Sequence, residues 1–423
     1  MRIGFVSTRF HGTDGVSLEA SKWARVLEEE LGHECFWFAG KLDTPEHSSS
    51  LCPKAFFEDP SVISLQEKLF SNLNSCPKDL DDSVNILERE IYNSLENFIR
   101  EHSIDLVIPQ NVLAIPMHVP MGLAVTNLAA NGLPMVAHHH DFYWERERFL
   151  KGCAQHYLDF AFPPKFSEKF QHVVINSRAK ESLMERLELE STVIPNVFDF
   201  ENPPSKEDDY GDDFRDQFQI ESDEILILQP TRIVPRKGIE LSIELCSRIQ
   251  ERTKEKICLV VSHLAGDEGM DYYYQLVDLS ERLKVKVIWA GERVGEFRGL
   301  NSSGEKLYNL WDVYPHADFV TYPSLYEGFG NALLETFYFS KPVLVNRYPV
   351  FKDDIEPCGF KVVSMDSEIT DEVVSETIDL ILDKDLARQW TQLNYDLCME
   401  NFSYKALRNS LENILNELMT SND

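Results

Sequence analysis

The sequence predicts an α/β protein made of two doubly wound domains, each with a parallel sheet. The chain has 423 residues, which is too long for one ordinary hydrophobic core, so two domains of roughly 200 residues are the natural division. Short β-branched runs alternate with amphipathic helical stretches along its length, a pattern typical of parallel sheets covered by helices. Hydrophobic residues make up 43% and charged residues 26% of the chain, as in globular proteins.

The first domain is expected over residues 1–198 and opens with a strand at 2–7. A glycine-containing turn, Gly12-Thr-Asp-Gly15, follows this strand, and residues 16–31 then carry apolar side chains at helical spacing. Further strands are expected at 35–38, 106–108, 135–139 and 173–175. Residues 44–82 are rich in Ser, Pro and Asp, and we expect an irregular surface excursion there.

The second domain is expected over residues 199–403. Pro195 and Asn196 interrupt the preceding pattern, and an acidic stretch begins at Glu201. Strands are expected at 224–229, 257–262, 285–289, 319–321 and 343–346, with helices at 239–252 and 272–283 between them. The final amphipathic stretch predicts a C-terminal helix, 404–423, that packs back on the first domain.

Charge and cysteine content limit the classes of function. The chain has 71 acidic and 41 basic residues, a net charge of −30, which counts against binding nucleic acid or anionic lipid. Its eight cysteines form no CxxC pair, so we expect neither a zinc site nor a disulfide framework. Prolines and asparagines interrupt the most apolar stretch, 112–137, and no signal peptide precedes the first strand, so we expect a reduced, cytoplasmic protein without a transmembrane segment.

The sharpest motif is Ser324-Leu-Tyr-Glu327-Gly-Phe-Gly-Asn-Ala-Leu-Leu-Glu335. The two glycines allow a close backbone approach to a ligand, and free N–H groups at a helix start attract phosphate or sugar oxygens. A carboxylate beside them can accept hydrogen bonds from sugar hydroxyls. A capped helix with an exposed glutamate is the structural alternative.

A second motif, Pro230-Thr-Arg232-Ile-Val-Pro-Arg236-Lys237-Gly238, directly follows an expected strand. An arginine and a lysine five residues apart on such a loop can clamp a diphosphate, the arginine through its fork and the lysine as a point charge. A solvated basic turn is the alternative, but a tight basic cluster is less expected in so acidic a chain.

Together these motifs resemble the retaining glycosyltransferases of group 1, often called family 4, which have the GT-B fold. The linker VIPNVFD at 193–199 and the run ADFVTYPSLYEGFGNALLETF at 317–337 also match that family, and the resemblance extends over nearly the whole chain. It implies two Rossmann-like domains facing across a cleft, with the C-terminal helix returning to the N-terminal domain. It also implies a GDP- or UDP-hexose donor bound by the C-terminal domain, an acceptor on the N-terminal side, and no required cofactor.

The resemblance also assigns roles to single residues. Arg232 and Lys237 would hold the donor diphosphate, and Glu327 would orient the donor sugar during catalysis. Glu335 would bind the ribose hydroxyls. The other donor contacts that we expect are Gly12, Gly15, Arg293, Gly328, Phe329, Gly330 and Asn331.

The family places a histidine near the reacting sugar, and this chain offers three in a row before Asp141: His138, His139 and His140. The order His-Asp-aromatic at a strand end favours His140, with His139 next. Adjacent strand residues face opposite sides of a sheet, so three consecutive histidines cannot all face one ion, and we expect no metal site.

The segment Asp141-Phe-Tyr-Trp-Glu-Arg-Glu-Arg148 is dense in aromatic and charged groups. Aromatic faces stack on sugars, and arginines hold carboxylates or phosphates, so we expect a small, polar or acidic, soluble acceptor. This region is similar to that of osmolyte-forming transferases that glycosylate glyceryl-glucosides, which implies a glycosylglycerate-type compatible solute. The expected acceptor contacts are His139, Asp141, Tyr143, Trp144, Gln110 and Asn111. In the alternative interpretation, Arg146 and Arg148 are surface residues paired with neighbouring glutamates.

The sequence therefore predicts a metal-independent, retaining hexosyltransferase (EC 2.4.1 type) that transfers glucose or mannose between small molecules. A retaining disaccharide phosphorylase on the same fold would use the same residues and stays open. A non-catalytic sugar-nucleotide-binding protein is the third possibility, although the four motif residues needed for catalysis are all present. The sequence also leaves a homodimer open.

Overall fold

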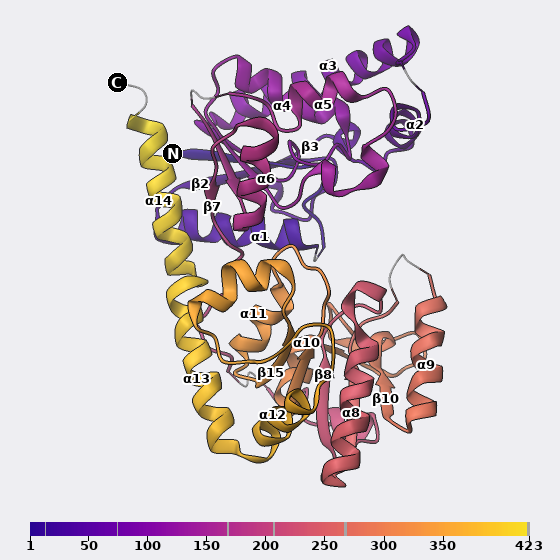
Figure 1. Cartoon of the computed structure of the whole chain (residues 1–423). Coiled ribbons are helices and arrows are strands. Elements are labelled where there is room, and N and C mark those ends of the chain that lie inside the picture. The colour runs from indigo at the N-terminus through magenta and orange to yellow at the C-terminus, as the bar shows by residue number, and fades with distance from the viewer. Residues whose placement is uncertain (13, 74, 167–168, 206–207, 266–268, 421–423) are drawn as a thin grey trace. The chain divides into compact units, whose positions relative to one another are not determined.

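A computed structural model describes residues 1–12, 14–73, 75–166, 169–205, 208–265 and 269–420 (Figure 1). The chain divides into two compact units. The first comprises Met1–Val197 together with Tyr404–Asp423, and the second comprises Phe198–Ser403. None of the described helices is both long and apolar enough to cross a membrane.

The first unit is built on a seven-stranded sheet in the order β3-β2-β1-β4-β5-β6-β7, and every neighbouring pair is parallel. Its strands are β1 Arg2–Val6, β2 Glu34–Ala39, β3 Ser49–Leu51, β4 Leu106–Pro109, β5 Met135–His139, β6 Phe170–Val174 and β7 Thr192–Val193. Strand order runs outward from the neighbours β1 and β4. This is the doubly wound arrangement that the sequence predicts, and its switch point lies between those two strands.

Helices cover both faces of this sheet (Figure 1). On one side lie α2 Pro60–Leu69, α3 Lys78–His102, α4 Val119–Ala130 and α5 Gln155–Ala161, whose apolar residues share one core cluster. On the other side lie α1 Gly15–Arg25, continued by a π-helical turn Val26–Glu30, and α14 Tyr404–Thr420. Leu407, Leu411 and Ile414 pack into the same core as Trp23, so the C-terminal helix covers the first unit as expected. The remaining helix, α6 Ser177–Leu187, follows β6.

The expectation of an irregular excursion at 44–82 is wrong. This segment supplies the edge strand β3, the helix α2 and the start of α3. Helix α2 begins at Pro60, whose preset φ suits a first helical turn, and the Asp59 side chain accepts a hydrogen bond from the Ser61 N–H. Its buried Val62, Leu65 and Leu69 follow helical spacing, a signal that the flanking Ser, Pro and Asp residues obscured.

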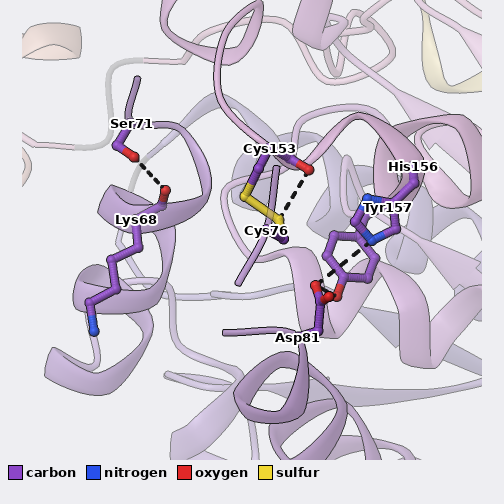
Figure 2. The surroundings of a disulfide bond; sticks show 7 residues. All are labelled: Lys68, Ser71, Cys76, Asp81, Cys153, His156 and Tyr157. Carbon is purple, nitrogen blue, oxygen red and sulfur yellow. Dashed lines mark hydrogen bonds and ion pairs between the residues drawn. A yellow bond between two sulfur atoms is a disulfide. The ribbon is translucent and has the colours of Figure 1, made fainter. Parts of the chain in front are cut away.

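The expectation of a fully reduced chain is also wrong. Cys76 and Cys153 form a disulfide across 77 residues of sequence (Figure 2). It links the segment before α3 to the segment before α5. Beside it, the Tyr157 hydroxyl donates a hydrogen bond of 2.8 Å to the Asp81 carboxylate (Figure 2). The first unit thus carries a covalent link between two segments that cover the same face of its sheet.

The second unit has a six-stranded parallel sheet in the order β10-β9-β8-β14-β15-β16. Its strands are β8 Ile225–Gln229, β9 Ile257–Val261, β10 Lys286–Trp289, β14 Phe319–Tyr322, β15 Val343–Asn346 and β16 Val363–Met365. Its helices are α7 Phe214–Gln217, α8 Ile239–Thr253, α9 Asp271–Leu283, α10 Leu310–Val313, α11 Asn331–Tyr338, α12 Asp371–Leu382 and α13 Lys384–Asn401. The expected strands and the two expected helices are present within one or two residues. The unpredicted β16 extends the sheet beyond β15.

A small three-stranded sheet, in the order β11-β13-β12, is inserted between β10 and β14. It consists of β11 Val294–Gly295, β12 Gly299–Leu300 and β13 Lys306–Asn309. The insertion follows the carboxyl end of β10, and Arg293, an expected donor contact, directly precedes β11.

Candidate active site

The predicted motifs of the second unit lie where its strand order reverses, between β8 and β14. The basic loop follows β8, and the glutamate loop follows β14. Gly238 has a φ of +62°, and a Cβ added there would lie 2.5 Å from the Pro323 carbonyl oxygen. Leu325 N–H also donates a hydrogen bond of 2.8 Å to the Arg236 carbonyl. The two loops therefore touch, and glycine is required at the contact.

Lys237 and Glu327 form a buried ion pair at this switch point. Each side chain is only 10% exposed, and Lys237 Nζ donates a short hydrogen bond to Glu327 Oε1. Burial lowers the pKa of Lys237, against the opposing effect of the Glu327 charge. Arg236 Nη1 lies 3.6 Å from the other Glu327 oxygen. The glutamate is thus held in place by two cations from the facing loop.

Arg232 adds a further positive charge near the pair. Its exposed guanidinium makes no hydrogen bond or ion pair with any residue that the structure describes. Its charge contributes to lowering the pKa of Lys237. The pKa of His263, at the end of β9, falls to about 4 through burial and the charges of Arg232 and Lys237. Three cations and one carboxylate therefore leave a net positive field, which suits an anion such as a diphosphate.

The glycines of the second motif pack against a buried tyrosine. The Tyr348 hydroxyl donates a hydrogen bond of 2.7 Å to the Phe329 carbonyl oxygen. A Cβ on Gly330 would lie 2.5 Å from that same hydroxyl, and Gly330 has a φ of +124°. The Phe329 side chain is buried and packs edge-on against Phe402, so a ligand could use only the backbone of this residue. Tyr348 thus fixes the turn that precedes α11.

Glu335 and Asn331 lie on α11, the helix that this turn opens. Both are half-buried, and the Glu335 charge contributes to raising the pKa of the buried Tyr314. Gly328 is half-buried in the loop before the helix. The structure therefore brings Lys237, Glu327 and the α11 residues to one edge of one sheet.

Arg293 is engaged elsewhere. Its guanidinium donates to the Lys306 carbonyl at 3.1 Å and to the Gln217 side-chain oxygen at 3.0 Å, and it lies 4.6 Å from the centre of the Phe218 ring. These contacts tie the small sheet to α7. These hydrogen bonds serve the fold, and contact of Arg293 with the donor stays a prediction.

In the first unit, a pocket of about 220 Å³ lies at the switch point between β1 and β4. Residues following β1 and β4 form most of its wall, as expected for a ligand site in a doubly wound sheet. Its lining comprises Ser7, Thr8, Arg9, Asp14, Val16, Phe57, Gln110, Asn111, Val112, Ile115, Met117, His118 and Arg146. The expected acceptor residues Gln110 and Asn111 are among them, while Arg9, Phe57 and His118 were missed.

Gln110 connects two of the three histidines. Its Oε1 lies 3.0 Å from His138 Nδ1 and 3.2 Å from His140 Nε2. With this oxygen as the shared acceptor, the facing nitrogens of the two rings are the donors. His138 is fully buried and stacks on Trp23, whereas His140 is half-buried. Burial lowers the pKa of His140 to about 4, so this ring is neutral at neutral pH.

Asn111 and Asp141 join the ends of β4 and β5. Asn111 takes a left-handed φ of +59°. Its side-chain amide donates a hydrogen bond of 2.8 Å to Asp141 Oδ1, and its Oδ1 accepts a hydrogen bond of 3.0 Å from the backbone N–H of His140. Asp141 Oδ2 in turn accepts from Arg146 Nε at 3.1 Å and from its Nη2. This chain of contacts fixes His140 and Arg146 relative to each other.

Four expected acceptor residues do not line the pocket, and one of them, Asp141, instead holds the lining residue Arg146. His139 is 1% exposed and pairs with His172 on β6 at 3.0 Å. Trp144 donates a hydrogen bond of 2.9 Å to the Ser182 hydroxyl and packs against a small apolar cluster that includes Ala179 and Leu183 of α6. Tyr143 packs against the main core of the unit. The local sequence could not show that these rings complete the core.

The glycine loop after β1 is described except for residue 13. Gly12 has a φ of +76°, and its N–H donates a hydrogen bond of 2.8 Å to the Asp43 carboxylate. Gly15 opens α1, where Asp14 caps the helix by accepting from the Val16 and Ser17 N–H groups. Asp14 also pairs with Arg9 at 3.2 Å. The loop thus brings a fixed carboxylate and a fixed arginine to the pocket.

Comparison with known proteins agrees with this architecture. The family model for glycosyl transferases group 1 matches residues 211–396. The glycosyltransferase of Rickettsia africae has a TM-score of 0.65 and 16% identity over 99% of this chain and 98% of that one. The Anabaena protein Alr3699/HepE in complex with UDP has a TM-score of 0.63 and 17% identity over 99% and 100% of the two chains. These structures show that the chain has the GT-B fold.

Sequence relatives place the chain in its family. The mannosylglucosylglycerate synthase of Petrotoga mobilis is 35% identical over 87% of both chains. The protein of the same name from Thermotoga maritima is 32% identical over 97% of this chain and 99% of that one. The chain belongs to the group 1 glycosyltransferases.

Proposed function

We propose that the chain is a retaining, metal-independent hexosyltransferase that moves a hexose from a GDP- or UDP-sugar to a glycosylglycerate. Two relatives similar over most of the chain are named for a product in which glycerate carries two sugars. The last step toward such a product joins a hexose to a glycosylglycerate. The name also favours mannose as the transferred hexose.

The observation that carries the donor half of this proposal is the Lys237–Glu327 pair beside Arg232. In the transfer, the bond between the anomeric carbon and the diphosphate oxygen breaks, and an acceptor hydroxyl oxygen bonds to that carbon. The hydroxyl proton passes to the departing diphosphate. Arg232 and Lys237 would stabilise the charge that develops on this leaving group, which is electrostatic catalysis by fixed cations. These side chains supply the role that a metal ion fills in other transferases.

Glu327 and the neutral His140 would act on the sugars. A buried carboxylate held by two cations keeps free lone pairs that can accept from hydroxyls of the transferred hexose. His140 has an N–H whose position Gln110 fixes, and its neutral ring adds no charge near the reacting carbon. Gly12 and Gly15 would approach the donor, and Glu335 would accept from the ribose hydroxyls.

A donor screen tests this function. The purified chain is heated with UDP, GDP, ADP and their glucose and mannose conjugates in the presence of a chelator, and we expect one nucleotide to raise the melting temperature selectively. Lys237→Met and Glu335→Ala should abolish this shift. Lys256→Met is the matched control, because that lysine is exposed and pairs only with Asp223 among the described residues.

The selected donor is then incubated with a glucosylglycerate, and the product is analysed by mass spectrometry and by NMR of the new anomeric proton. An added hexose with the anomeric configuration of the donor supports the proposal, and inverted configuration contradicts the retaining mechanism. A thermal shift by hexose-1-phosphate alone, with phosphate-dependent cleavage of a disaccharide, would indicate the phosphorylase instead.

A further inference from the structure

We propose that Arg9 and Arg146 form a clamp for the acceptor's carboxylate in the pocket between β1 and β4. This inference rests on the proposed function, because a glycosylglycerate offers one carboxylate among many hydroxyls. It names the residues that would distinguish an acidic acceptor from a neutral one. Both arginines line the pocket.

The charge of the pocket favours an anion. Its charged lining residues are Arg9, Arg146 and Asp14, two positive and one negative, in a chain whose net charge is −30. His118 also lines the pocket, but burial lowers its pKa to about 4, so it is neutral. Two arginines on the wall of one pocket are unexpected in so acidic a chain, and recognition of an anion provides a reason for them.

Each arginine is already oriented by a carboxylate that has other donors of its own. Asp141 holds Arg146 through Nε and Nη2, while its second oxygen accepts from Asn111. Asp14 lies 3.2 Å from Arg9 and also accepts from the Ser17 hydroxyl at 2.6 Å. Anchoring one edge of a guanidinium lowers the entropy cost of binding an anion with the remaining donors.

The arginines also keep N–H groups for a ligand. Nη1 of Arg146 makes no hydrogen bond with the described parts of the chain, and the side chain is 44% exposed. Arg9 is 31% exposed and lies 5.3 Å from the centre of the Phe57 ring, which also lines the pocket. A guanidinium has five N–H donors, so each can hold an aspartate and still donate to a second carboxylate.

The size of the pocket suits the acid end of the acceptor. Its volume of about 220 Å³ is below the roughly 300–1,000 Å³ of pockets for drug-sized ligands. It therefore fits a glycerate group better than a whole disaccharide. Ser7 and Thr8, which follow β1, also line the pocket. The Ser7 hydroxyl donates to the Gln110 carbonyl at 3.2 Å and could accept from a glycerate hydroxyl, and the Thr8 hydroxyl could bind a glycerate oxygen.

The test compares two acceptors that differ at one group. Glucosylglycerate carries the carboxylate, and glucosylglycerol carries a neutral hydroxymethyl group in its place. Binding is measured by calorimetry and transfer by kcat/KM for the wild type, Arg146→Gln, Arg9→Gln and Arg89→Gln. Arg89 is the control, because it is an exposed arginine of the same unit that lies on α3 and is not among the lining residues.

We expect the wild type to prefer the acid. Arg146→Gln and Arg9→Gln should weaken binding of the acid roughly 10- to 100-fold, the value of a charge-assisted hydrogen bond, and leave the neutral compound unchanged. KM for the donor should not move, and Arg89→Gln should behave as the wild type. Equal use of both acceptors by the wild type would overturn the clamp, as would equal losses in Arg146→Gln and Arg89→Gln.

Binding separates this inference from the proposed function. If the wild type binds glucosylglycerate through Arg146 but transfers no hexose to it, the clamp stands and the proposed reaction fails. If hexose is transferred to glucosylglycerate with unchanged efficiency in Arg146→Gln and Arg9→Gln, the reaction stands and the clamp is refuted. Tighter binding of glucosylglycerol phosphate than of glucosylglycerate would refute a carboxylate site in favour of a phosphate site.

Discussion

Replacing Gly330 by alanine should destabilise the second unit through two separable effects. The first is backbone strain, because Gly330 has a φ of +124° and L-residues at such angles cost about 1–3 kcal/mol. The second is steric, because the new Cβ would lie 2.5 Å from the Tyr348 hydroxyl oxygen. Overpacking of a buried site costs about 1–3 kcal/mol, so the sum is about 2–6 kcal/mol.

The steric effect depends on a single atom. After the Tyr348 oxygen, the nearest atoms to the new Cβ are the Tyr322 hydroxyl at 3.5 Å and Tyr348 Cζ at 3.6 Å, which are ordinary contacts. Tyr348→Phe removes the clash, and by itself it should cost about 1–3 kcal/mol, because the Phe329 carbonyl loses its donor. In that background, Gly330→Ala should cost only the strain.

Thermal unfolding of the four proteins measures this coupling, with about 2–4 °C expected for each kcal/mol in a domain of this size. Gly359→Ala is the control for strain alone, since Gly359 has a φ of +93° and no atom within 4 Å of an added Cβ. The nucleotide-dependent shift should also fall more in Gly330→Ala than in the double variant. Equal costs of Gly330→Ala in both backgrounds would refute the steric argument, and no cost in either would refute the backbone assignment.

Three further predictions concern the first unit. Glu19→Gln should lower the free energy of unfolding by about 3–5 kcal/mol, because the fully buried Glu19 accepts a hydrogen bond from the Val197 N–H and forms an ion pair with Lys22. Denaturant unfolding measures this change, and a loss below about 1 kcal/mol would contradict it. Reducing the Cys76–Cys153 disulfide, which spans 77 residues, should cost about 4.5 kcal/mol by the loop-entropy relation, and a serine double variant should show no response to reductant. Burial lowers the pKa of His172 to about 4, so between pH 6.5 and 4 the unfolded chain binds more protons than the folded one. Stability should therefore fall on acidification through this window, by about 2 kcal/mol at pH 5 for this group, and stay level above pH 7; an unchanged unfolding midpoint between pH 7 and 5 would contradict it.

The features that sequence could predict are those with a local signal. Strands β1, β8 and β14 are short apolar runs, and the loops after them combine glycine with charge, so Lys237 and Glu327 were found. Their direct pairing was not predicted, since it depends on β8 and β14 being neighbours in the sheet. Sheet order is a property of the whole domain and leaves no mark on either motif.

The features that sequence missed depend on contacts between distant segments. Cys76 and Cys153 meet because α3 and α5 cover the same face, and no cysteine spacing indicates this. Tyr348 is one aromatic residue in an apolar segment, and its role appears only when its hydroxyl meets the Gly330 turn. Conversely, Trp144 and Arg293 look like ligand contacts by residue type, but their polar atoms serve the fold.

Three cations of the two candidate sites share one arrangement, because each is paired with its own carboxylate. Lys237 is held by Glu327, Arg146 by Asp141 and Arg9 by Asp14. In a chain of net charge −30, loosely placed cations would pair with whichever surface carboxylate lies nearest. A dedicated carboxylate prevents this, but it also cancels much of the cation's charge at long range. Attraction of the donor would then depend most on Arg232, whose guanidinium is exposed and has no partner within the described residues. Arg232 would supply the long-range charge, while the paired cations would supply fixed short-range donors.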